Sequence, residues 1–192
     1  MIAAAVLAAG RGERFGGDTP KPLVAFRGRP LVLHALDAAG ASGLAPVLLI
    51  VGNGAEAVAA VVPPTVEVVR NDAWASGIAS SLVSALGALR HRDDVDAVVI
   101  GLADQPLVGA DAYRRLAAAY DDGARLAVAT YGGTRGNPVL LARAHWEEAM
   151  TLTGDEGARV LLGRHPAVEV SCDGTGSPTD VDTPADLAAL EG

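Results

Sequence analysis

The first 23 residues constrain the fold more than any other stretch of the sequence. Ile2 to Leu7 is a short apolar run without a charge, which is typical of a strand buried on both faces of a sheet. The chain then runs directly into a loop rich in glycine and basic residues, which extends from Ala8 to Leu23. A buried strand followed by such a loop is where an α/β sheet usually binds a phosphate.

The loop combines backbone freedom with positive charge. Glycine permits positive φ and lets backbone amides approach an anion, and the loop holds Gly10, Gly12, Gly16 and Gly17. It also holds three basic side chains suited to phosphate, which are Arg11, Arg14 and Lys21. The loop therefore predicts a phosphate site, and a flexible surface loop whose charges only maintain solubility is the alternative interpretation.

Two common phosphate loops do not fit this stretch. Phe15 stands where the third glycine of a dinucleotide fingerprint would follow Gly12. Lys21 lies between Pro20 and Pro22, so the Gly-Lys-Ser/Thr sequence of a P-loop is missing, and the prolines restrict the backbone around the lysine.

Composition narrows the class of protein. The chain has 192 residues, half of them hydrophobic, which suits a single domain over residues 1–192. The net charge of −8 argues against general nucleic-acid binding, and Cys172, the only cysteine, excludes an intrachain disulfide and a cysteine metal cluster. Neither a transmembrane run nor a signal peptide is recognisable, so we expect no membrane association and a cytoplasmic location.

Hydrophobic periodicity predicts alternating strands and helices. We expect strands at 2–7, 46–51, 66–70, 97–102, 126–130, 139–141 and 167–171. We expect helices at 30–41, 54–61, 78–89, 110–120, 142–150, 156–163 and 184–190. This alternation predicts an α/β fold, a Rossmann-like domain of three α/β/α layers with a mainly parallel sheet.

A polar helix start follows the third predicted strand. The segment from Asn71 to Leu82 contains Gly77, and Ser80 and Ser81 occupy the first turn of the helix behind it. Such a helix start offers backbone N–H donors and a favourable dipole to a ligand. Ordinary capping by Ser76, with Trp74 in the core, is the alternative.

Carboxylates occupy two places suited to a cation. Asp104 follows a buried strand, at the edge where open α/β sheets bind ligands, and a hard oxygen donor there suits Mg²⁺ bound to a nucleotide. A turn or capping aspartate is the alternative for Asp104. Asp180 and Asp182 share a face if their segment is extended, and Asp186 suits the start of the last helix.

The N-terminal stretch resembles the signature of the nucleotidyltransferases that include the molybdenum cofactor guanylyl- and cytidylyltransferases. The matching residues run from Leu7 to Gly16 as Leu-Ala-Ala-Gly-Arg-Gly-Glu-Arg-Phe-Gly, followed by Lys21. The resemblance implies nucleotide binding by Leu7, Ala8, Ala9, Gly10, Arg11, Gly12 and Lys21. It also implies that Lys21 and Arg14 offset charge in the transition state, with Asp104 as the third catalytic residue.

Two further stretches resemble elements of the same family. Asn71 to Leu82 is similar to the Asn-x₅-Gly-Met/Leu-x₂-Ser-Leu element of the cytidylyl branch. This similarity implies that the base and ribose lie at Asn71, Gly77, Ser80 and Ser81, and it favours CTP over GTP. Asp104-Gln105-Pro106 and Asp180-Val181-Asp182-Thr183-Pro184 resemble the metal elements, which implies Mg²⁺ ligation by Asp104 and Asp182, with Asp180 as a weaker candidate.

The acceptor elements of the family are also similar. Gly136-Asn137-Pro138-Val139 resembles Gly-His-Pro-Val, with Asn137 in place of histidine, and Gly154 to Arg159 resembles Gly-Asp-x-Gly-Ala-Arg. The resemblance implies acceptor binding by Gly136, Asn137, Pro138, Asp155 and Arg159.

Together these resemblances imply a Mg²⁺-dependent enzyme that transfers CMP from CTP to the phosphate of a small acceptor. The acceptor that they favour is molybdopterin. A molybdoenzyme or its chaperone would then be a partner. A guanylyl- or sugar-phosphate nucleotidyltransferase of the same fold is the nearer alternative. A non-catalytic nucleotide-binding regulator is the more distant one.

Overall fold

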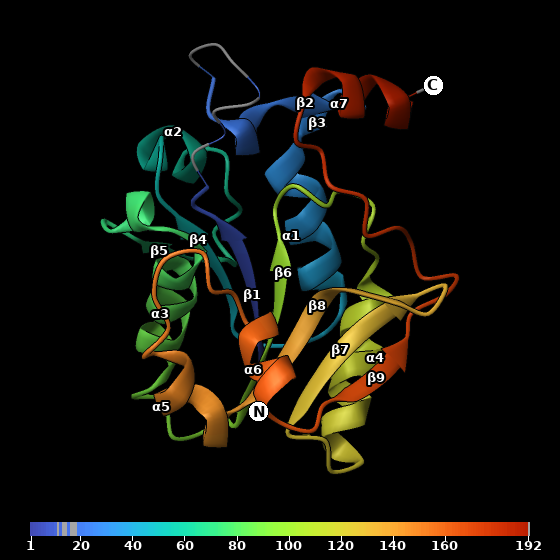
Figure 1. Ribbon diagram of the computed structural model, residues 1–192. Coiled ribbons are helices and arrows are strands. Elements are labelled where there is room, and N and C mark those ends of the chain that lie inside the picture. Colours follow the sequence, from blue (N-terminus) through green and yellow to red (C-terminus); the bar gives the residue numbers. More distant parts are fainter. Residues whose placement is uncertain (11, 13–14, 16–18, 192) are drawn as a thin grey trace.

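The sheet is organised around β1 (Ile2–Ala8), the strand predicted at the N-terminus. The computed structural model describes residues 1–10, 12, 15 and 19–191. Within these residues a seven-stranded sheet has the order β5-β4-β1-β6-β8-β7-β9 (Figure 1). The other strands are β4 (Val47–Val51), β5 (Glu67–Arg70), β6 (Ala97–Leu102), β7 (Leu126–Tyr131), β8 (Thr134–Ala142) and β9 (Val168–Ser171).

Most of the sheet is parallel, as the alternation of elements predicts. β1 pairs in parallel with both β4 and β6, β4 pairs in parallel with β5, and β7 pairs in parallel with β9. Only β8 runs against its neighbours β6 and β7. The carboxyl ends of β1 and β6 therefore lie side by side, because Leu7 is in register with Leu102.

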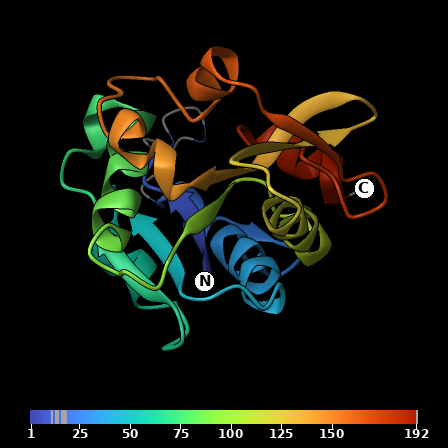
Figure 2. The ribbon, with the colours of Figure 1, turned by 90° about the horizontal axis from the view of Figure 1, so that it is seen from below.

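Helices cover both faces of the sheet and confirm the three-layer α/β/α fold (Figure 2). Alternate residues of β1 face opposite cores, since Ala4 and Val6 belong to one cluster of buried side chains and Ala3 and Ala5 to the other. The first cluster includes residues of α1 (Leu31–Ala41), α2 (Ala55–Ala59) and α4 (Ala110–Asp121). The second includes residues of α3 (Ile78–Leu89), α5 (Trp146–Ala149) and α6 (Arg159–Arg164).

The hairpin from β7 to β8 corrects the predicted strand at 139–141 and the predicted helix at 142–150. β8 is nine residues long, and Ala142 is still paired with Ala97. Gly132 and Gly133 both have positive φ, which matches a tight hairpin turn. The early residues of β8 are polar and exposed, so they lack the apolar pattern of a buried strand. Only a short 3₁₀ turn, η4 (Arg143–His145), and the single turn of α5 remain of that predicted helix.

The predicted helix at 156–163 begins later, at Arg159, because Glu156 accepts a hydrogen bond from the Thr153 amide in a turn. The last helix, α7 (Pro184–Glu191), agrees with its prediction and lies at the same end of the molecule as the short ribbon of β2 (Ala25–Phe26) and β3 (Arg29–Pro30) (Figure 1). No helix within the described residues has both the length and the apolar character needed to cross a membrane.

Candidate active site

Three predicted site residues meet at the carboxyl edge of β1 and β6. Lys21 lies on the 3₁₀ turn η2 (Lys21–Leu23), Asp104 follows β6, and Asp182 precedes α7. The Lys21 ammonium donates hydrogen bonds to Asp104 Oδ2 at 2.6 Å and to Asp182 Oδ1 at 2.8 Å. Two carboxylates far apart in the sequence therefore share one cation.

The Lys21 side chain is mostly buried, with 13% of it exposed. Burial alone would lower the pKa of Lys21, but the charges and hydrogen bonds of Asp104 and Asp182 outweigh it and raise that pKa above its ordinary value. The lysine is therefore a fixed positive charge at neutral pH.

Backbone contacts hold the lysine and Asp104 in place. The Ala103 amide donates to Leu7 O at 3.0 Å, which fixes the residue before Asp104 against the end of β1. A Cβ at Gly12 would lie 2.9 Å from the Cβ of Lys21, and Gly12 has φ +64°. Glycine at this position allows the loop to pass close to the lysine.

A reciprocal cap at the start of α7 positions Asp182. Asp186 Oδ2 accepts hydrogen bonds from the amides of Asp182 and Thr183, and the Asp186 amide donates back to Thr183 Oγ1. This is a capping box, which satisfies the free amides of a helix start. Val181 is fully buried beside Phe26 and Leu31, so the segment that carries Asp182 is anchored on both sides.

Asp180 is close to the same cluster. Gln105 Nε2 donates to Asp180 Oδ1 at 2.9 Å, and partial burial followed by the negative charge of Asp104 raises the pKa of Asp180. The buried oxygen Oδ1 of Asp104 has no hydrogen-bond partner within the described residues. Hard oxygen donors with such an unsatisfied atom fit a Mg²⁺ or Mn²⁺ ion, so the residues present suit the predicted metal.

Cavities follow this edge of the sheet on both sides of Asp104. One cavity of about 470 Å³ is lined by Lys21, Asp104 and Asp182 together with Leu7, Ala8, Gly10 and Gly12. A second, of about 250 Å³, is lined by Ala9, Gly10, Trp74, Gly77, Ile78, Ser81, Asp104 and Asp155. A third, of about 390 Å³, is lined among others by Leu7, Arg135, Gly136, Asn137, Asp155 and Arg159. Leu7 lines all three, at the end of β1.

The structure thus brings most of the predicted nucleotide residues to this edge. Arg11 and Arg14, which carry the predicted extra positive charges, lie outside the described residues. Gly77 has φ +114°, and a Cβ there would lie 2.2 Å from the Gly154 carbonyl oxygen, so glycine is required for α3 to start against this loop.

Asn71 has a structural role that the sequence did not indicate. Its side chain is buried, and its amide donates to Ser80 Oγ at 2.8 Å and to Ser81 Oγ at 3.1 Å. Asn71 lines none of the three cavities and instead fixes the first turn of α3. Ser80 likewise lines none of them, whereas Ser81 lines the second cavity.

The alternative interpretation of Ser76 and Trp74 is wrong. The N-cap of α3 is Gly77, while Ser76 Oγ donates to the Ala73 carbonyl. Trp74 is half-buried and lines the second cavity, so it does not lie in the core as that alternative required. Trp74 lies in η3 (Trp74–Ser76), three residues before Gly77. In the sequence, this position just before a predicted helix start was the available signal for a place at the cavity.

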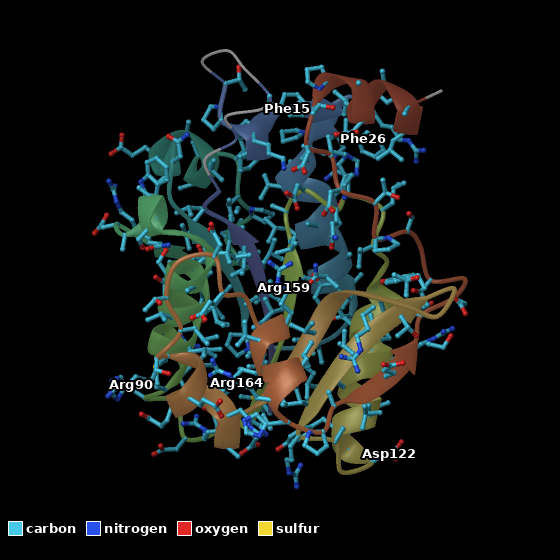
Figure 3. The ribbon with its side chains drawn as sticks, in the orientation of Figure 1. Phe15, Phe26, Arg90, Asp122, Arg159 and Arg164 are labelled. Atoms are coloured by element: carbon cyan, nitrogen blue, oxygen red, sulfur yellow. The ribbon has the colours of Figure 1, made fainter. Side chains whose placement is uncertain are left out.

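The predicted acceptor residues gather at the third cavity, with one exception. Gly136 and Asn137 approach from β8, and Asp155 and Arg159 from the loop before α6 and its first residue; Figure 3 shows Arg159 near the middle of the molecule. Pro138 is buried and lines none of the three cavities. Arg135, which sequence analysis missed, adds a second positive charge.

An α/β sheet with a lysine and two carboxylates at this edge defines a nucleotidyltransferase-type domain. Residues 4–169 match the MobA-like NTP transferase domain family, and the chain belongs to this family. It is 32% identical to the nicotine blue oxidoreductase of Paenarthrobacter nicotinovorans over 194 residues, which cover 95% of this chain and 92% of that protein.

Two solved structures support the same assignment. Rv0371c from Mycobacterium tuberculosis H37Rv matches with a TM-score of 0.86 and 34% identity, over 98% of this chain and 96% of that one. A complex of Rv0371C with manganese matches with a TM-score of 0.81 and 32% identity, over 99% and 97%. The predicted fold and family are thus confirmed, and a similar chain binds a divalent metal.

Proposed function

We propose that this protein transfers CMP from CTP to the phosphate of a small acceptor and releases pyrophosphate, with molybdopterin as the acceptor we favour. The observation that carries the proposal is the contact of Lys21 with both Asp104 and Asp182 at the carboxyl edge of the sheet. This arrangement places positive and negative charge where a triphosphate and its metal would meet.

In the proposed reaction an oxygen of the acceptor phosphate attacks the α-phosphorus of CTP. The bond from the α-phosphorus to the oxygen that bridges it to the β-phosphorus breaks, and pyrophosphate leaves with that electron pair. The acceptor phosphate is already anionic at neutral pH, so no strong general base is needed. The protein contributes positioning and charge neutralisation, and Lys21 stabilises the charge that moves onto pyrophosphate.

Asp104 and Asp182 would hold Mg²⁺. The unsatisfied Asp104 Oδ1 and the hard donor set support this part of the proposal, as does the manganese complex of the similar Rv0371C chain. The metal would neutralise negative charge on the triphosphate. Arg14, which lies outside the described residues, is proposed as a second positive charge.

We assign the substrates to the second and third cavities, which share Asp155 in their lining. Gly77 and Ser81 line the second cavity, which supports it as the nucleoside site, and their cytidylyl-type sequence favours CTP. Arg135 and Arg159 line the third cavity, and two guanidinium groups suit a phosphorylated acceptor. A molybdoenzyme or its chaperone would receive the product. We propose that the whole chain acts as one cytoplasmic nucleotidyltransferase domain.

A panel of CTP, GTP, ATP and UTP tests the proposal, with Mg²⁺ and either molybdopterin or a sugar phosphate as acceptor. Pyrophosphate release is the readout, and we expect the fastest release with CTP and molybdopterin. If only the sugar phosphate supports pyrophosphate release, the acceptor is a sugar phosphate instead of molybdopterin, and the proposed nucleotidyl transfer still stands.

The name of the relative from Paenarthrobacter nicotinovorans gives a second candidate function, oxidation or reduction of a pigment of the nicotine blue type, because the 32% identity spans nearly the whole of both chains. The same preparation should therefore be assayed for loss of nicotine blue colour, with NADH or NADPH added as the electron donor. Colour loss without pyrophosphate release under any condition would favour that redox function over nucleotidyl transfer.

A further inference from the structure

Two histidines and a glutamate converge outside the cavities described above. His145 ends η4, Glu148 lies in the single turn of α5, and His165 follows α6. One ligand atom from each side chain lies within 4.8 Å of the other two. None of the three residues lines the three cavities at the edge of the sheet.

An ordinary ion pair accounts for only part of this cluster. His165 Nε2 lies 2.6 Å from Glu148 Oε2, and both side chains are 34% exposed. The His145 ring lies 4.9 Å from the His165 ring, centroid to centroid. Within the described part of the chain, however, no hydrogen-bond partner faces the His145 ring nitrogens. Within these residues, His145 therefore presents an imidazole that is not hydrogen-bonded, beside the His165–Glu148 pair.

The backbone around the cluster is well anchored. Trp146 is buried, and its Nε1 donates to the Leu141 carbonyl at 3.2 Å. The Arg143 guanidinium donates to the carbonyls of Val95 and Arg90. On the other side, the His165 amide donates to the Leu161 carbonyl at 3.0 Å, and Leu161 is fully buried. The three side chains thus come from fixed backbone, which lowers the cost of bringing them onto one ion.

Glu148 has a neighbour that directs its carboxylate. Arg164 Nη1 lies 3.4 Å from Glu148 Oε1, so the other oxygen, Oε2, faces His165. Figure 3 shows Arg164 beside α5. An outer contact of this kind orients a ligating carboxylate without occupying the atom that binds.

We propose that His145, Glu148 and His165 bind one transition-metal ion of the Zn²⁺ or Co²⁺ class. Two imidazoles and one carboxylate are a donor set for such ions, whereas Mg²⁺ prefers oxygen ligands alone. The site is separate from Asp104 and Asp182 and does not rest on the proposed reaction. The bound ion would join the C-terminal end of α6 to α5, and the other end of α6 carries Arg159.

The test uses Co²⁺ and Zn²⁺ on the full chain in the presence of excess Mg²⁺, which is intended to occupy the oxygen-donor site. We expect one equivalent of Co²⁺ to bind with a visible absorption band, and Zn²⁺ to displace it. His145→Ala and Glu148→Gln should each weaken Co²⁺ binding by at least about tenfold, since loss even of an outer contact commonly costs that much. His34→Gln is the matched control, because His34 lies on α1, which packs on the opposite face of the sheet from α5 and α6, and this variant should bind Co²⁺ like the wild type.

Circular dichroism on each metal-free variant confirms the fold before titration. Equal Co²⁺ affinity in the wild type, His145→Ala and Glu148→Gln would overturn the proposal. So would failure of the folded wild type to bind Co²⁺ or Zn²⁺ under excess Mg²⁺. The imidazole carbon resonances of His145 and His165, followed by NMR, give a second readout, and both should shift on Zn²⁺ addition while those of His34 stay unchanged.

Discussion

Lys21 Nζ lies 2.6 Å from Asp104 Oδ2, although the two residues are 83 positions apart in the chain. The sequence predicts the lysine for the triphosphate and the aspartate for the metal, and the structure pairs them with each other. The lysine also contacts Asp182, so its ammonium is bonded to both predicted metal ligands. The proposed substrate and metal would therefore compete with an internal ion pair, and the first three predictions depend on this pair.

Asp104→Asn should lower kcat by at least about a hundredfold, because it removes a metal-binding charge from the reacting centre. Steady-state pyrophosphate release measures the loss, and thermal unfolding verifies that the variant is folded. Asp111→Asn is the control, since Asp111 pairs with Arg114 on the exposed surface of α4, and its turnover should equal that of the wild type. Near-normal turnover in folded Asp104→Asn would rule out the metal assignment.

Lys21→Ala should lower kcat by roughly a hundredfold, on the scale of one lost electrostatic donor in an active site. Lys21→Arg should not restore the rate, because a planar guanidinium cannot replace a compact ammonium between two carboxylates. Full kinetics on both variants separate kcat from KM. A change in KM for the nucleotide alone would make Lys21 a binding residue.

The same substitution should have the opposite effect on metal binding without nucleotide. Lys21→Ala removes a positive charge that occupies Asp104 and Asp182, so Mn²⁺ should bind more tightly, by about tenfold or more for charges this close. Electron paramagnetic resonance of free Mn²⁺ measures the affinity. Unchanged or weaker Mn²⁺ binding would mean that the lysine does not shield the carboxylates. An Asp182→Asn variant, which loses a ligand, should weaken Mn²⁺ binding.

CTP should bind more tightly than GTP in calorimetric titrations with Mg²⁺. The expectation rests on the segment from Gly77 to Leu82 and on the placement of Gly77 and Ser81 at the second cavity. Paired hydrogen bonds to a base edge are what separate one nucleotide from another. Tighter binding and faster turnover of GTP would place the protein with the guanylyltransferases.

Asp180 should make stability depend on pH in a particular direction. Its pKa in the folded protein is raised above the ordinary value of 3.8, mainly by partial burial, so the folded state holds the proton more tightly than the unfolded state. Ionisation of Asp180 therefore costs stability. That cost is fully present above the raised pKa, shrinks as pH falls through it, and is absent below the ordinary value of 3.8. Asp180→Asn should have a higher Tm than the wild type at pH 7, and the difference should shrink in acid. A constant difference across pH 3 to 7 would contradict this.

The sequence predicts the central strands β1, β4 and β6 well because they are buried on both faces and are continuously apolar. Asp104 could be placed from the end of β6 alone. The hairpin from β7 to β8 could not be placed, because the polar first half of β8 lies at the surface and carries no burial pattern.

Site contacts were harder to predict than site positions. Resemblance brought Asn71, Ser80 and Ser81 together as ligand residues, but it could not show that the Asn71 amide hydrogen-bonds both serines. Pro138 shows the same difficulty in the predicted acceptor motif. The motif included Pro138 as an acceptor residue, but a motif does not reveal which of its residues is buried. The pairing of Lys21 with Asp104 depends on tertiary approach, for which one sequence carries no signal.

The close approach of Gly77 to Gly154 joins the walls of the second and third cavities. The Ala79 amide donates to the Gly154 carbonyl at 3.0 Å, and the next residue, Asp155, lines both the second and the third cavity. If a ligand in one cavity moves this contact between the start of α3 and the loop at Gly154, the lining of the other cavity moves with it. Cooperativity of this kind would be reciprocal. If the nucleotide changes the affinity for the acceptor by some factor, the acceptor changes the affinity for the nucleotide by the same factor.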